Sequence, residues 1–215
     1  MLSPRLQHPD FVIDSVEALV AGAGMDALTI RALTKATGFS NGAIYRTFGS
    51  RGGLIGRMWI RAECRFMALL KSLVAQAQDP FDAVLAAAEA SIHYPERYPQ
   101  SAAVLFTVRR EEALTKPISP EASEQLCALD HELAQIISRL TMDLWKRTDA
   151  AAVDLVSACI LDLPKWIALR STRYAKPIVR EYLRAAVRAV LEVGPPPLTQ
   201  EWAVKPAGDM YCVLV

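Results

Sequence analysis

The sequence predicts an all-α protein, with nine helices arranged in two domains. Apolar residues recur at three- and four-residue spacing along most of the chain, whereas the alternating runs typical of strands are rare. Capping residues stand before these segments, and glycines or prolines stand after them. With 215 residues, of which 52% are hydrophobic and 22% charged, the chain is long and apolar enough to bury a sizeable core.

Caps and breakers set the boundaries of the first four predicted helices. The first begins at Pro9 and ends near residue 21, before a pair of glycines. The second follows Thr29 and stops at Gly38, and the short third follows Ser40 and ends near residue 48. The fourth follows Ser50 and runs to about residue 78.

Prolines separate most of the later helices. The predicted spans are 80–93, 99–111, 120–146, 149–171 and 175–193. Pro164 lies inside the eighth span and should kink it. We therefore expect a helix-turn-helix domain over 1–56, a helical ligand-binding and dimerisation domain over 57–194, and an irregular tail over 195–215.

The segment from Leu28 to Leu54 carries most of the functional information. Two short capped helices are joined by Thr37-Gly38-Phe39, which is the arrangement of a helix-turn-helix motif. Packing of the apolar residues in this segment leaves four residues on the outer face of its second helix. These residues have small, amide, aromatic and guanidinium groups, which suit DNA base edges and phosphates: Asn41, Gly42, Tyr45 and Arg46.

Positive charge is concentrated in the same region. The whole chain carries a net charge of only +1, yet seven basic residues and one acidic residue, Glu63, lie between Thr29 and Arg65. Such a local excess is typical of phosphate binding. Arg57, Arg61 and Arg65 lie four residues apart, so they share one helix face, which either keeps that face soluble or attracts DNA.

Several classes of protein are excluded. The first ten residues lack the apolar segment of a signal peptide, and charged residues and a proline interrupt the most apolar stretch. The cysteines are far apart, so we expect reduced thiols, and no His or Cys spacing suits zinc. We expect a cytoplasmic protein with no cofactor, no metal and no catalytic site; it is not expected to be an enzyme.

A family resemblance follows from the second helix of the motif. The pattern S-x-G-A-I-Y-x-x-F-x-S spans Ser40 to Ser50, and residues 11–59 resemble the DNA-binding domain of TetR-type bacterial transcriptional regulators. The resemblance implies a homodimer formed by the eighth and ninth helices, a ligand cavity in the C-terminal domain, and release from operator DNA when a ligand binds. It places Thr29, Tyr45 and Arg51 at phosphates. Base edges would be met by Ser40, Asn41, Gly42 and Arg46.

The sequence departs from the family pattern at three places. Asn41 replaces a common lysine, and Arg46 replaces a common histidine, which adds a side chain able to bond guanine through two donors. Gly52-Gly53 replaces an acidic-apolar pair, which predicts a looser start of the fourth helix.

Large apolar residues on the helices that line the family's cavity are ligand-site candidates, with ordinary core packing as the alternative: Phe66, Met67, Leu70, Phe106, Trp145 and Trp166. The predicted function is a repressor that a small, largely apolar effector releases from its operator. The alternative is an all-helical small-molecule carrier or enzyme with a vestigial helix-turn-helix, which burial of Tyr45 and Arg46 would favour. The sequence does not distinguish this repressor from an activator or from a constitutive DNA-binding protein without an effector.

Overall fold

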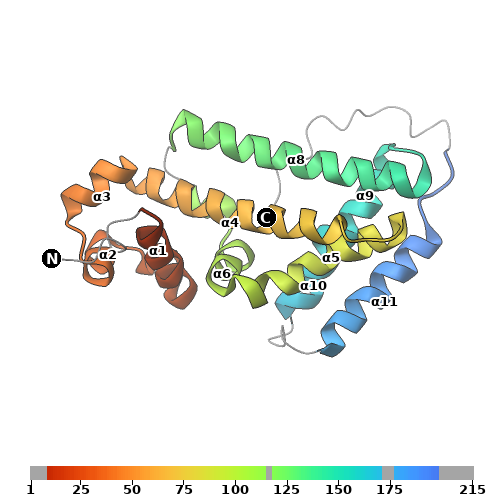
Figure 1. Cartoon of the computed structure of the whole chain (residues 1–215), viewed down its shortest axis with the longest axis horizontal. Coiled ribbons are helices and arrows are strands. Elements are labelled where there is room, and N and C mark those ends of the chain that lie inside the picture. Colours follow the sequence, from red (N-terminus) through yellow and green to blue (C-terminus); the bar gives the residue numbers. More distant parts are fainter. Residues whose placement is uncertain (1–8, 115–117, 171–176, 199–215) are drawn as a thin grey trace. The chain divides into compact units, whose positions relative to one another are not determined.

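A computed structural model describes residues 9–114, 118–170 and 177–198, and these residues form helices without any strand (Figure 1). The all-α prediction is therefore confirmed. The helices are α1 (Pro9–Ala23), α2 (Ile30–Thr37), α3 (Asn41–Phe48), α4 (Arg51–Val74), α5 (Pro80–Arg97), α6 (Pro99–Thr107), α7 (Arg110–Ala113), α8 (Pro120–Trp145), α9 (Ala150–Ser157), α10 (Leu163–Arg170) and α11 (Pro177–Val193).

The predicted eighth helix is divided into three parts. Between α9 and α10 lies a π-helical turn, Ala158–Asp162, in which the N–H of Leu163 bonds the carbonyl of Ala158 five residues back. Pro164 follows at once and has no N–H for the carbonyl of Ile160, so the regular α-helical ladder cannot continue through it. The break thus lies where the proline predicted one.

Other helix ends differ from the prediction by a few residues. Helix α4 ends at Val74, and the amides of Gln76 and Ala77 beyond it bond carbonyls three residues back, which tightens the chain into turns. Helix α5 continues past Pro95 to Arg97, whereas α6 ends at Thr107 and the short α7 follows it. Residues 199–215, most of the predicted tail, lie outside the described residues.

The described residues group into two compact units. The first contains residues 9–65, 98–114 and 118–128, and the second contains residues 66–97, 129–170 and 177–198. Helices α4 and α8 each contribute residues to both units. The predicted division at residue 56 concerns functional domains and stays a prediction. In their contacts, residues 57–65, 98–114 and 118–128 group with the N-terminal helices.

In the second unit, α5 is buried on most of its surface. It is rich in alanine, and Ala87, Ala88 and Ala90 are fully buried. Helix α5 packs against α11, α10 and the π-helical turn (Figure 1). Glu89 lies in the same stretch and accepts hydrogen bonds from Arg180 and Arg184 of α11, at 2.7–3.0 Å. Burial raises the pKa of Glu89, but these hydrogen bonds outweigh burial and hold its pKa below the usual value. The carboxylate therefore stays charged and joins α5 to α11.

The junction between α3 and α4 depends on Gly53. Its N–H bonds the hydroxyl of Ser50 at 2.9 Å, which caps α4. A Cβ atom on Gly53 would lie 2.2 Å from the carbonyl oxygen of Phe48, closer than atoms can approach. The helix start is thus capped and closely packed, and the expected loosening is not what the structure shows.

Gly53→Ala is expected to lower the free energy of unfolding by about 1–3 kcal/mol, because the added methyl group must displace the α3–α4 backbone. Gly22→Ala is the matched control, since a Cβ at Gly22 of α1 meets nothing within 4 Å. That variant should be as stable as the wild type or up to about 1 kcal/mol more stable. Urea unfolding measures both, and equal stability of the two variants would contradict the close packing.

Candidate nucleic-acid interface

Two hydroxyl caps and one glycine shape the helix-turn-helix. The Oγ1 of Thr29 accepts the N–H of Ala32 at 3.0 Å, and the Oγ of Ser40 accepts the N–H of Ala43 at 3.2 Å. Between the two helices Gly38 has a φ of 74°, in the left-handed region that glycine adopts readily. Each capping hydroxyl accepts the backbone N–H through a lone pair of its oxygen. Its O–H group can therefore still donate a hydrogen bond to a phosphate.

The outer face of α3 carries the four residues that the sequence placed there. Ile44 and Phe48 are buried, whereas Asn41, Gly42 and Arg46 are exposed. Tyr45 is 45% exposed. An aromatic ring, an amide and a guanidinium group therefore share one solvent-facing surface of a rigid helix. This exposure opposes the vestigial alternative, which required Tyr45 and Arg46 to be buried.

Helix α2 adds two cations to the DNA contacts that the sequence predicted. Arg31 and Lys35 are both exposed and lie four residues apart, so they share one face of α2. Their four-residue spacing is visible in the sequence, although neither residue belongs to the family pattern of α3. These two residues extend the basic surface of the helix-turn-helix.

Arg51, a predicted phosphate contact, donates some of its hydrogen bonds to the protein backbone. Its Nη2 donates to the carbonyl oxygens of Leu28 at 3.2 Å and, more weakly, of Met25 at 3.5 Å. These bonds tie the start of α4 to the 3₁₀ turn Met25–Ala27 that precedes α2. They use only one of the guanidinium nitrogens, so a phosphate contact by Arg51 stays a prediction.

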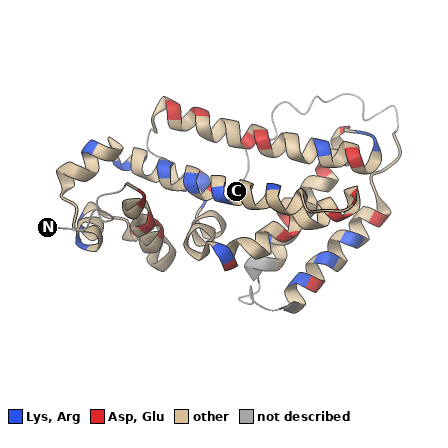
Figure 2. Cartoon of the chain, in the orientation of Figure 1, with Lys and Arg blue, Asp and Glu red and all other residues tan. Residues whose placement is uncertain are grey.

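Two of the three α4 arginines point to acidic groups of the same unit. Arg61 lies 3.2 Å from Glu17 through Nε and 2.8 Å from Asp14 through Nη1. Nη1 of Arg65 lies 3.2 Å from Glu17 and donates to Ser101 at 2.8 Å, and Ser101 donates to Glu17 at 3.0 Å. Figure 2 shows this distribution, with basic residues along α4 and acidic residues on α1. The basic excess of the sequence is therefore partly neutralised within the unit.

Four of the six ligand-site candidates belong to the core of the second unit. Met67 and Leu70 are buried in that core, and Phe66 and Trp145 pack against it. The rings of Phe66 and Tyr94 meet in an edge-to-face arrangement, with 5.3 Å between centroids. Two candidates do not join them. Trp166 is 63% exposed on α10, and Phe106 belongs to the first unit.

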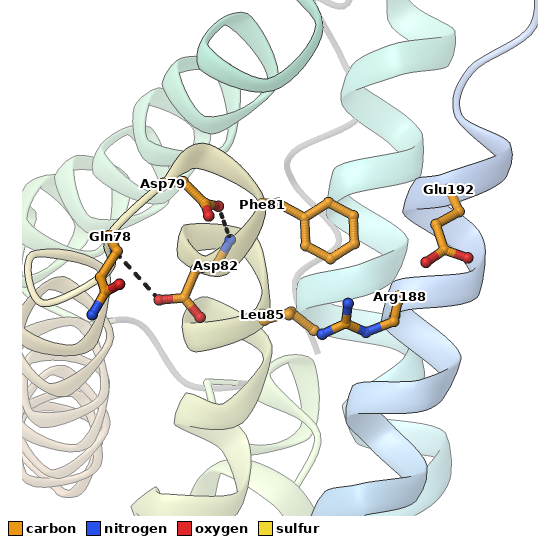
Figure 3. Close-up of a pocket in the computed structure, with 7 residues that line it drawn as sticks. All are labelled: Gln78, Asp79, Phe81, Asp82, Leu85, Arg188 and Glu192. Atoms are coloured by element: carbon orange, nitrogen blue, oxygen red, sulfur yellow. Dashed lines mark hydrogen bonds between the residues drawn. The ribbon is translucent and has the colours of Figure 1, made fainter.

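A hollow of about 560 Å³ lies on the second unit, between the start of α5 and α11 (Figure 3). None of the ligand-site candidates lines it. Asp79 accepts the N–H of Asp82 at 2.8 Å, Asp82 accepts the N–H of Gln78 at 3.3 Å, and the guanidinium of Arg188 lies 5.4 Å from the centroid of Phe81. The acidic side chains thus cap α5, and the hollow differs from the apolar cavity that the sequence predicted.

Neither a membrane span nor a metal cluster is found among the described residues. None of their helices is long and apolar enough to cross a bilayer. No three His, Cys, Asp or Glu side chains in this part of the chain come close enough together to hold an ion.

Comparisons with known proteins agree with this geometry. Residues 12–58 match the family model of the bacterial regulatory proteins of the tetR family. No curated protein matches the chain. The helices from α1 to α4 and the exposed face of α3 define a helix-turn-helix DNA-binding protein. Within that class, the matched segment resembles the transcriptional regulators of the TetR type.

Solved structures extend the likeness in fold to most of the chain. The TetR regulator PfmR of Thermus thermophilus is 20% identical, with a TM-score of 0.56 over 84% of this chain and 97% of its own. KstR2, a ketosteroid transcriptional regulator of Mycobacterium tuberculosis, is 15% identical, with a TM-score of 0.63 over 91% and 97%. AibR, solved with isovaleryl coenzyme A and operator DNA, is 11% identical, with a TM-score of 0.65 over 88% and 99%.

Proposed function

We propose that the protein is a homodimeric repressor that reads duplex DNA with α3 and leaves its operator when a small apolar effector binds the second unit. The observation that carries this proposal is the exposure of Tyr45 and Arg46 on α3, while Ile44 and Phe48 of the same helix are buried. A fixed helix presents groups of this chemistry to solvent, as a reader of the major groove must.

The contacts divide into two kinds. Thr29, Tyr45 and Arg51 would bond phosphates and set the register of the protein on the duplex. Base edges would be met by the start and middle of α3: Ser40, Asn41, Gly42 and Arg46. Arg46 can donate two bonds to guanine, and the amide of Asn41 matches adenine. A Cβ at Gly42 would meet nothing within 4 Å in the protein, which leaves room there for close approach of DNA.

The proposed effector site lies in the core of the second unit, around Phe66, Met67, Leu70 and Trp145. One support is that the buried side chains there are large and apolar. A second support is that AibR, of the same fold, was solved with an acyl coenzyme A and operator DNA. Helix α4 is continuous from Arg51 to Val74, so one helix carries residues of both proposed sites. Release requires the effector to bind the DNA-free conformation more tightly.

The proposed dimer surface lies on α11. This helix is apolar on two faces: Val179, Leu183, Val187 and Leu191 are buried, while a second apolar row is exposed. The exposed row consists of Ile178, Tyr182, Ala185, Ala189 and Val193, at spacings of three and four residues. Tyr182 is 61% exposed, and Trp166 of α10 is also on the surface. An apolar row of this length is typical of an interface, and a second copy can present the same row across a two-fold axis.

Tyr45→Ala and Arg46→Ala are each expected to weaken binding to the DNA upstream of the protein's own gene by about 5- to 150-fold, the loss of one phosphate or base contact. Fluorescence anisotropy at several salt concentrations measures the binding constants. Arg139→Ala, which removes an exposed charge of α8, is the matched control and should bind like the wild type. If both α3 variants also bind like the wild type, α3 is not the reader. Compounds that release DNA in this assay would identify effectors.

Tyr182→Glu is expected to shift the protein toward monomer, because it places a charge within the apolar row of α11. Sedimentation velocity over a series of protein concentrations measures the change. The matched control is Met142→Glu, which alters a 43% exposed apolar side chain of α8 in the same way. A Tyr182→Glu protein that sediments as the wild-type dimer would exclude α11 from the interface.

A further inference from the structure

Arg57 differs from the other two arginines of the α4 row. Its side chain is exposed, and the centre of its guanidinium lies 5.8 Å from the ring centroid of Phe48. Arg61 and Arg65 follow at four-residue intervals, but both approach the buried carboxylate of Glu17. Within the described part of the chain, no carboxylate lies within ion-pair distance of Arg57. One member of the row therefore keeps its charge available to a ligand.

The contact with Phe48 fixes where this charge lies. Phe48 is the last residue of α3 and is only 6% exposed, so its ring is held by the core of the first unit. A cation over an aromatic ring is attracted by the ring face and uses none of the five N–H donors of the guanidinium. Arg57 is thus held at the C-terminal end of α3, and its contact with the ring leaves its N–H donors able to bond a phosphate.

The length of α3 indicates where Arg57 would lie relative to the DNA backbone. Eight helical residues extend about 12 Å, and the major groove of B-DNA is about 12 Å wide. When the start and middle of α3 meet base edges, its C-terminal end approaches the phosphates that border the groove. A cation held at the end of α3 is therefore well placed to meet the backbone of the DNA.

We propose that Arg57 is a phosphate contact of the DNA-binding surface, and that it is the only one of the three α4 arginines to serve this purpose. This inference rests on the proposed reading of DNA by α3. Because phosphate contacts release counterions, each one adds about 0.9 to the slope of log binding constant against log salt concentration. Arg57 should contribute to this slope, whereas Arg61 and Arg65 should not.

The experiment uses the full-length protein and a fluorescein-labelled mixed-sequence duplex of about 30 base pairs, since phosphate contacts do not depend on sequence. Anisotropy titrations across a salt series give the slope for each variant. Arg57→Gln is expected to reduce the slope by about 0.9 for each bound protomer, and Arg57→Lys, which keeps the charge, should retain it. Arg139→Gln removes the same charge from α8 and should leave the slope unchanged.

The outcomes separate this inference from the proposed function. A wild-type slope in Arg57→Gln, whether or not the melting temperature falls, would mean that Arg57 only covers Phe48, and the inference would be overturned while DNA binding stands. A wild-type protein that shows no salt-dependent binding to the duplex would overturn both. Circular dichroism of Arg57→Gln confirms that any loss of slope comes from a folded protein.

Discussion

The first unit depends on one buried carboxylate. Glu17 is 1% exposed, and its two oxygens are shared among Arg61, Arg65 and Ser101. These partners come from α4 and α6, and Glu17 itself comes from α1. A buried carboxylate that loses its partners is strongly destabilising, so each of the three helices is held in the position that satisfies it. The link to Ser101 joins α6 to the N-terminal helices of the same unit.

The ion pairs of Glu17 also decide which basic residues of the DNA-binding region remain exposed. Of the seven basic residues between Thr29 and Arg65, Arg61 and Arg65 neutralise acidic groups inside the unit, and Arg51 is partly used on backbone carbonyls. The exposed cations lie on α2, on α3 and at Arg57 of α4. Some basic residues of this segment therefore stabilise the fold, and others remain exposed for DNA. The net charge of the segment is larger than the charge that can meet phosphates.

Local signals predicted the fold well, because caps, glycines and prolines act within a few residues. Thr29, Ser40 and Gly38 occupy the caps expected of them, and Pro164 follows the break in the long C-terminal helix. Contacts between distant residues could not be predicted in this way. The pairing of Glu17 with Arg61 joins residues 44 positions apart, and helical spacing shows only that the arginines share a face. The exposure of Trp166 likewise depends on which side of α10 the core covers.

The claim that Glu17 holds the first unit together is tested most directly by the free energy of unfolding of Glu17→Gln in urea. We predict a loss of about 3–5 kcal/mol, because Arg65 would lose its carboxylate partner and Arg61 would keep only the exposed Asp14. Glu132→Gln, which removes the carboxylate of the half-exposed pair with Lys71, should cost at most about 1 kcal/mol. Equal, small losses in the two variants would contradict the account, since Glu17 would then be only one of many replaceable contacts.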